Sequence, residues 1–134
     1  MRTVAWFALL VLVSASCAAG FPPPETTARE IVKAAISRDV ASLTSRLSGV
    51  PLKLVLAAGS QPEKHEAVCK RLIRLEIVPA AWRLRFARAV YQDDGSTVNL
   101  HLCLQYTRDG RLQLAEMFWK MSLVDGGWKL VAHD

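Results

Sequence analysis

The chain has 134 residues, a length typical of one domain, and 51% of them are apolar, which excludes a disordered protein. Lysine and arginine outnumber aspartate and glutamate by 17 to 12, which gives a formal charge of +5 at pH 7 and a pI near 9.5. Three cysteines are too few for a disulfide-dense scaffold or for a zinc site made of four thiolates.

The first twenty residues have the three parts of a secretory signal peptide. Arg2 supplies the positive charge, an apolar run covers residues 4–13, and small residues lead to Gly20. A run of about ten apolar residues is too short to cross a bilayer. We therefore expect a leader over residues 1–20 and a secreted product, or a periplasmic one in a bacterium, with no transmembrane segment after cleavage. The pattern leaves open the exact cleavage site and lipidation at Cys17.

The next part of the chain predicts helices. Residues 21–26 form a Pro-rich lead-in, and Thr27 with Glu30 forms a capping box at the start of a helix. Asp39 is a point at which this helix could divide, and Ser48-Gly49 is expected to end it. The predicted buried stripe consists of Val32, Ile36, Val40, Leu43 and Leu47.

A second helix is expected to begin at Pro62, because proline suits the first helical position. Glu63 lies in its first turn and basic residues lie in its last turns, an order that complements the helix dipole. Pro79 is expected to terminate it. The short apolar run at residues 52–58 has no periodicity that distinguishes a helix from a strand.

From Trp82 onward the hydrophobic period changes to two, which predicts four antiparallel strands in series. Asp-Gly pairs at 94–95, 109–110 and 125–126 separate the alternating runs, and Asp-Gly is a strong hairpin signal. The alternation slips after Phe86, which predicts a β-bulge. The predicted fold class is α+β, with N-terminal helices packed on a curved, mostly antiparallel sheet of about four strands in a meander.

This order of elements resembles the nuclear transport factor 2-like superfamily. The matching features are a capped helix leading into residues 37–43 and a last hairpin at residues 124–131, which contains Trp128. The resemblance covers residues 27–134 and implies a cystatin-like α+β cone with an apolar pocket between sheet and helices. Members include ketosteroid isomerase, scytalone dehydratase and polyketide cyclases. The catalytic tyrosine and aspartate positions of the family cannot be matched to residues of this chain.

Side chains along a strand face its two sides alternately, and this parity in the strand around Leu102 indicates what such a pocket could contain. Its leucines alternate with polar residues, so the apolar side is expected to face the helices. Acid–base catalysis needs a carboxylate or histidine inside the pocket, and parity places none there. We therefore expect no catalytic residue and no cofactor. The candidate pocket residues are Trp82, Phe86, Leu102, Tyr106, Met117 and Trp119.

These observations favour a non-catalytic binding module with an apolar interior for a small hydrophobic ligand or a protein partner. One alternative is that the same side chains simply fill the interior and leave no pocket. A second alternative, which rests on the family resemblance alone, is an enzyme of the isomerase, dehydratase or polyketide-cyclase type.

The opposite, outward face of the sheet carries further candidates. His101 and Cys103 share this face, but two residues do not complete a metal site, and we expect none. Phe118 is an outward-facing aromatic residue, which motivates a third alternative. In it, the chain forms a homodimer through the outer sheet face around His101, Gln105 and Phe118.

Cys69 and Cys103 remain after removal of the leader, and a disulfide between them is left open. A bridge would close a loop of about 35 residues and contribute roughly 4 kcal/mol on the chain-entropy model. Against the bridge, Cys103 points away from the face on which a helix carrying Cys69 would pack.

A cluster of basic residues suggests an anionic partner such as a surface polymer or a lipid headgroup. The alternative is a solvated surface. Nucleic acid is not expected as a partner, because no aromatic residues interleave with the basic ones to stack on bases. The cluster consists of Lys70, Arg71, Arg74, Arg83, Arg85 and Arg88.

Overall fold

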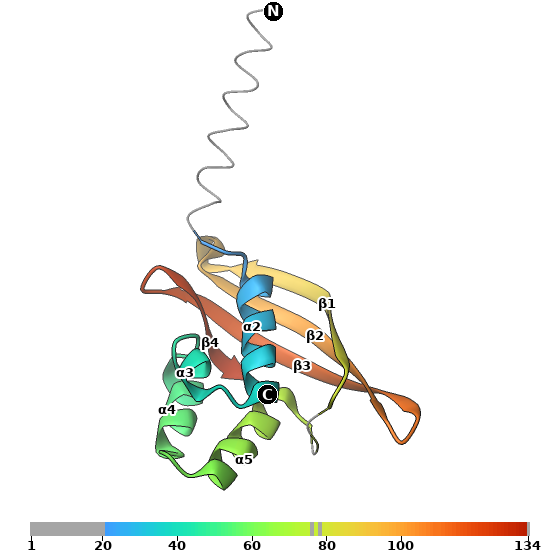
Figure 1. Cartoon of the computed structure of the whole chain (residues 1–134). Coiled ribbons are helices and arrows are strands. Elements are labelled where there is room, and N and C mark those ends of the chain that lie inside the picture. The colour runs from blue at the N-terminus through green and yellow to red at the C-terminus, as the bar shows by residue number, and fades with distance from the viewer. Residues whose placement is uncertain (1–20, 76, 78, 134) are drawn as a thin grey trace, which may run out of the picture.

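The computed structural model describes residues 21–75, 77 and 79–133, in which helices are followed by a sheet (Figure 1). The predicted leader at residues 1–20 lies outside the described residues. The helices are α2 (Pro24–Ser37), α3 (Val40–Thr44), α4 (Gly49–Ala57) and α5 (Pro62–Ile73). The strands are β1 (Trp82–Gln92), β2 (Thr97–Arg108), β3 (Arg111–Val124) and β4 (Gly127–His133), with a short 3-10 helix, Asp93–Gly95, before β2.

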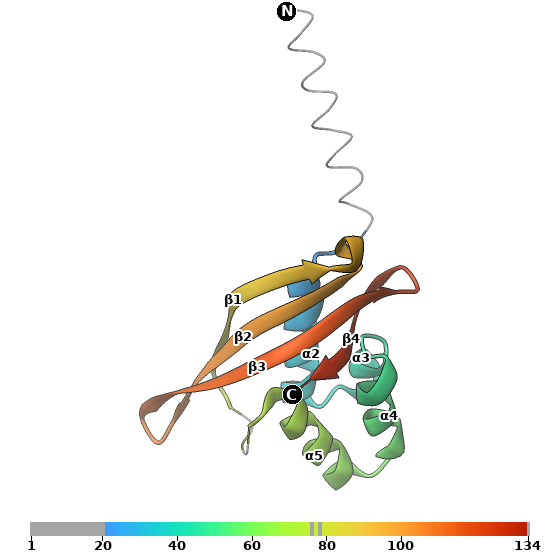
Figure 2. The same ribbon diagram turned by 180° about the vertical axis from the view of Figure 1, so that it is seen from behind.

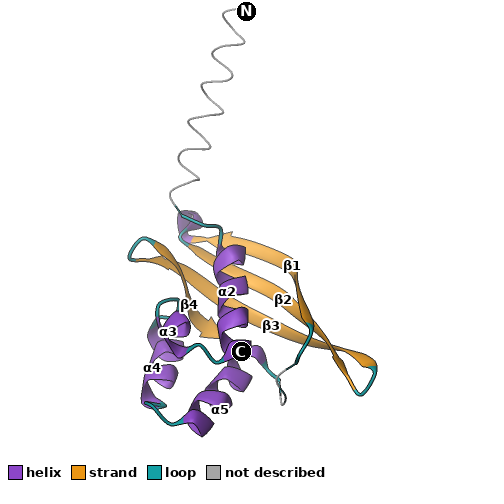
Figure 3. Cartoon of the chain, in the orientation of Figure 1, coloured by secondary structure: helices purple, strands orange, loops and turns teal. Residues whose placement is uncertain are grey.

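The sheet is an open antiparallel meander with the strand order β1-β2-β3-β4. All four α-helices lie on one side of it, and the view from behind shows the other side uncovered (Figures 2 and 3). This arrangement confirms the predicted α+β fold class. Among the described helices, none has both the length and the apolar character needed to span a membrane.

The core lies between the sheet and the helices, and strand parity determines which residues enter it. On β2, Leu100, Leu102 and Leu104 are at most 1% exposed, whereas the residues between them are partly exposed. Trp119 on β3 and Ile31 on α2 are equally buried in the same cluster. Burial of each such side chain contributes about 1.5–3 kcal/mol. The predicted inward face of this strand is therefore confirmed.

The first helix begins earlier than predicted, and the capping box at Thr27 is wrong. α2 begins at Pro24, and no side chain caps its first turn. Proline stabilises this start by itself, since its fixed φ is already helical and its missing N–H would have had no partner there. The helix ends before Arg38, which has a left-handed φ of 57°. Asp39 then caps α3, so the predicted division at this residue is confirmed.

Ser48-Gly49 does not end a helix, contrary to the prediction. Leu47 forms a parallel bridge with Leu130 of β4, and α4 begins at Gly49. The N–H of Leu130 donates to the Arg46 carbonyl at 3.0 Å, and the Ser48 N–H donates to the Leu130 carbonyl at 2.9 Å. These contacts between distant parts of the chain hold residues 46–48 against the edge of β4.

The second helix begins at Pro62 as predicted but ends well before Pro79. α5 stops at Ile73 because Arg74 adopts a left-handed φ of 54°. The run at residues 52–58, which periodicity leaves unassigned, lies largely in α4.

All three predicted hairpins are confirmed, because each Asp-Gly pair lies in the link between two antiparallel strands. Asp109 and Gly110 have φ values of 54° and 75°, and Asp125 and Gly126 have φ values of 50° and 83°. Positive φ at both central residues is the type I′ geometry, which matches the twist of the flanking strands. The link between β1 and β2 differs, because it contains the 3-10 turn at Asp93–Gly95.

Candidate functional site

The six predicted pocket residues lie in the core or against it. Leu102, Met117 and Trp119 are at most 1% exposed, and the other three are partly buried against the same cluster. These side chains therefore pack among themselves and against the helices. The groove described next lies on the opposite face of the sheet.

Strand register places two rows of side chains across the outer face. In the first row, Arg88 of β1 lies opposite His101 of β2, which lies opposite Phe118 of β3. In the second, Val90 lies opposite Asn99, which lies opposite Lys120. Six side chains from three strands therefore form one continuous surface.

A β-bulge in β1 creates the first row. The register shifts between Phe86 and Arg88, as the sequence predicts, and Ala87 is the extra residue. Because facing alternates along a strand, Arg88 would point toward the helices if Ala87 were a regular, paired strand residue. The bulge therefore brings Arg88 beside His101 on the outer face.

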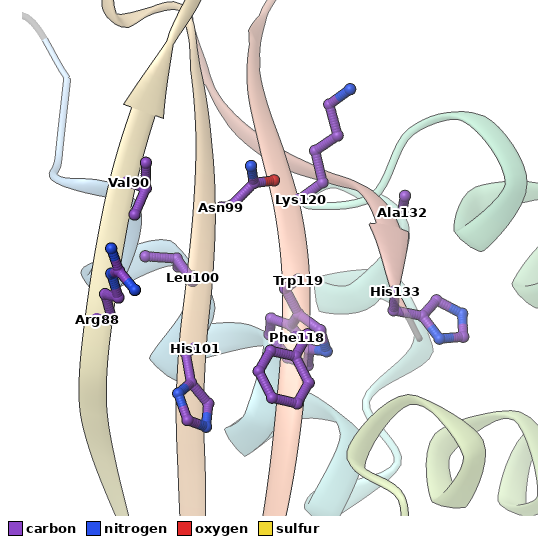
Figure 4. Close-up of a pocket in the computed structure, with 10 residues that line it drawn as sticks. All are labelled: Arg88, Val90, Asn99, Leu100, His101, Phe118, Trp119, Lys120, Ala132 and His133. Carbon is purple, nitrogen blue, oxygen red and sulfur yellow. The ribbon is translucent and has the colours of Figure 1, made fainter.

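An open groove with a volume of about 640 Å³ runs over this surface (Figure 4). Four strands contribute to it, so no single segment of the sequence contains the site. Its lining residues are Arg88, Val90, Asn99, Leu100, His101, Phe118, Trp119, Lys120, Ala132 and His133.

A stacked pair of rings forms a flat part of the groove. The rings of His101 and Phe118 have centroids 4.4 Å apart and planes 17° apart. Phe118 is 49% exposed, an unusual position for a large apolar ring. Nε2 of His101 lies 3.4 Å from Oε1 of Glu116 on the neighbouring strand. The pair offers a preformed flat surface to a ligand.

Two buried nitrogen atoms of groove residues have no hydrogen-bond partner. They are Nε1 of Trp119 and Nε2 of His101, whose 3.4 Å approach to Glu116 lacks hydrogen-bond geometry. Leaving such a group without a partner costs about 1–3 kcal/mol. The indole nitrogen of Trp119 is buried in the core, so a molecule in the open groove does not reach it.

Two cationic side chains flank the stacked rings. Arg88 comes from β1 and Lys120 from β3, and within the described part of the chain neither has an ion-pair partner. The groove therefore combines an apolar floor with unbalanced positive charge, an environment that attracts anions.

Cys103 lies beside His101 on the outer face, as parity predicts, opposite Arg85 and Glu116. Among the described residues, no group of three or more His, Cys, Asp or Glu side chains is arranged to hold a metal ion. Both Cys69 and Cys103 are free thiols. Cys69 is buried in α5, on the helix side of the sheet, and burial raises the pKa of its thiol.

The predicted basic cluster is divided between two sides of the molecule. Lys70 lies on α5, where its Nζ is 3.2 Å from Oε1 of Glu66. Arg83, Arg85 and Arg88 lie on the outer face of β1. Sequence reasoning grouped these residues by their positions in the chain, but Lys70 and the three strand arginines lie on opposite sides of the sheet.

Six of the ten groove residues were not among the candidate site residues: Val90, Asn99, Leu100, Lys120, Ala132 and His133. Parity correctly places Asn99 and Lys120 on the outer face. Their proximity follows only from the register of the strands.

No family model and no curated protein matches the chain. Among solved structures it is similar to the solution structure of a SEC-C motif-containing protein from Rhodopseudomonas palustris. The two share 13% sequence identity over 76% of this chain and 70% of that chain, with a TM-score of 0.46.

The predicted membership of the nuclear transport factor 2-like superfamily is wrong. No model of this or of any other family matches the chain. The resemblance rested on the order of helices and strands and on one Trp-containing hairpin. Many unrelated proteins share such an outline, because it follows from general rules of packing helices on a sheet.

Proposed function

We propose that this protein is a secreted, non-catalytic binding module that holds a small anionic ligand with a flat apolar body in the outer groove. The observation that carries the proposal is the exposed stack of His101 on Phe118 between two unpaired cations, Arg88 and Lys120. Secretion is inferred from the leader pattern at residues 1–20.

The groove suits a ligand that has both a flat apolar body and a negative charge. Ring surfaces stack favourably on a flat aromatic floor, and offset or edge contacts between aromatic groups contribute about 0.5–1.5 kcal/mol beyond their buried area. A carboxylate, sulfonate or phosphate would pair with Arg88 or Lys120. A purely apolar ligand would leave these polar groups without partners.

A pair of fluorescent dyes tests the proposal. 1-Anilinonaphthalene-8-sulfonate has flat rings and one negative charge, and N-phenyl-1-naphthylamine has the same rings without the charge. We expect the anionic dye to bind more tightly to the purified protein. Phe118→Ala should weaken both dyes about three- to tenfold, whereas Arg88→Gln or Lys120→Gln should weaken mainly the anionic one.

Leu112→Ala is the matched control for this titration. Leu112 lies on the same strand and the same face, is 68% exposed, and does not line the groove. If the dyes bind Phe118→Ala as tightly as they bind the parent protein, the proposed site is refuted. An equal loss of dye affinity in the Leu112→Ala control would also refute it. Mass spectrometry of the N-terminus after expression of the full chain tests the leader, since an intact Met1 would contradict secretion.

A homodimer through the outer sheet face is the second candidate, and exposed leucines on β3 favour it. Leu112 and Leu114 are 68% and 60% exposed, and no residue that the structure describes pairs with residues 111–118 on the β4 side. An exposed strand edge with apolar side chains is a template for pairing with a second copy. Light scattering tests this candidate. A monomeric mass at high concentration, unchanged by Leu114→Lys, would exclude it.

A further inference from the structure

The free edge of β1 is a second surface without an assigned role. β1 is hydrogen-bonded to β2 alone, and within the described residues no backbone group from elsewhere pairs with its other side. The edge of β4, by contrast, is covered by residues 46–48. An unpaired edge of this length presents backbone donors and acceptors to any extended chain that can approach it.

A row of arginines determines which chain can approach. Arg83, Arg85 and Arg88 lie on the outer face opposite Gln105, Cys103 and His101, respectively. In the described part of the protein, none of the three pairs with a carboxylate. The bulge keeps Arg88 in this row, so three guanidinium groups follow one another at the two-residue repeat of a strand, about 7 Å apart.

We propose that the edge of β1 binds an extended acidic segment of a partner protein, which adds to the sheet as a fifth strand. In an antiparallel pair, directly opposed side chains are about 4.5–5.5 Å apart. Acidic residues at alternate positions of the added strand would therefore lie opposite the three arginines. The backbone hydrogen bonds supply affinity in this mode, and the side chains supply specificity.

The same row excludes a second copy of β1 as the occupant. Two antiparallel copies would bring arginine rows together, and like charges on paired strands are destabilising. Asp93 and Asp94 follow β1 directly, and their negative charge would repel an acidic partner at this end of the strand. The acidic stretch of the partner is thus confined to the Arg83–Arg88 part of the edge.

Binding of synthetic peptides tests the proposal. The probe is a labelled peptide in which glutamate and threonine alternate, and its control has the same composition with the glutamates in one block. We expect the alternating peptide to bind more tightly. Replacing all three arginines with Glu should weaken its binding roughly ten- to a hundredfold, since each exposed ion pair contributes about two- to fivefold. An alternating lysine–threonine peptide should then bind this variant instead.

Two further arms separate strand addition from simple charge attraction. N-methylation of one alternate set of peptide amides should abolish binding, and methylation of the other set should leave it largely intact. The proposal would be overturned if the protein bound the alternating and the block peptide equally tightly, or if neither methylation pattern changed the affinity. Either result would indicate general polyanion binding, for which heparin is the comparison ligand. The variant Phe118→Ala should bind the peptide normally, so failure of the groove proposal and failure of this one remain distinguishable. Circular dichroism of the triple variant, whose changed side chains are all solvent-exposed, verifies that it is folded.

Discussion

Substituting Leu102 distinguishes a filled interior from one that contains a ligand cavity. Leu102 is fully buried and lies between Phe86 of β1 and Met117 of β3. If its neighbours fill the space around it, Leu102→Ala removes the transfer free energy of the side chain and leaves a new cavity. The expected loss is about 3 kcal/mol of unfolding free energy. For a domain of this size, that loss lowers the melting temperature by roughly 10–15 °C.

The assay is urea unfolding followed by far-ultraviolet circular dichroism, with Leu114→Ala as the control. Leu114 is a leucine on the neighbouring strand, but it is 60% exposed on the outer face, so its truncation should cost less than about 0.5 kcal/mol. A loss below about 1 kcal/mol for Leu102→Ala would refute the reasoning. It would mean that Leu102 already borders a void, and the interior would again be a candidate for the ligand site.

Three further predictions concern the cap, the turns and the thiols. Asp39→Ala should destabilise the protein less at acidic pH than at pH 7. The Ser42 hydroxyl donates to the Asp39 carboxylate and lowers the pKa of this carboxyl from its ordinary value of 3.8. The carboxylate therefore stabilises the folded protein above that ordinary value, and this stabilisation is lost as the pH falls through the lowered pKa. Urea unfolding at both pH values measures the difference. Gly110→Ala should cost about 1 kcal/mol because its φ is 75°, whereas Gly127→Ala, at a position without positive φ, should cost less in the same thermal melts. Cys103 should react with iodoacetamide in the native protein and Cys69 only on unfolding, as peptide mass mapping would show; fast native labelling of Cys69 would contradict its burial.

The strands could be predicted from the sequence because their signals are local. Alternation with period two specifies which face of β2 is buried, and the phase slip after Phe86 marks the bulge. Two Asp-Gly pairs specify turns that need positive φ at both residues. Each of these signals lies within a few residues of the structure that it predicts.

The helical part was predicted less well because distant contacts decide its boundaries. Leu47 fits a helical stripe in the sequence, yet it pairs with Leu130, more than eighty residues away in the chain. Ser48-Gly49 has the composition of a helix end but precedes α4. Local propensity is a weak prior that tertiary contacts override. The register shift in the pairing of β3 with β4, at which Val131 of β4 is left without a partner in the ladder, was likewise not predicted.

The candidate site could not be predicted, because it depends on register across three strands and not on any motif. Parity alone places His101 and Phe118 on the outer face, but only the pairing of β2 with β3 brings their rings into contact. Arg88 joins them because the bulge leaves Ala87 without a partner in the ladder, so that Arg88 and not Ala87 lies opposite His101. With Ala87 paired as a regular strand residue, Arg88 would face the helices and would belong to neither the groove nor the arginine row. The bulge at Ala87 therefore places Arg88 in both proposed binding surfaces.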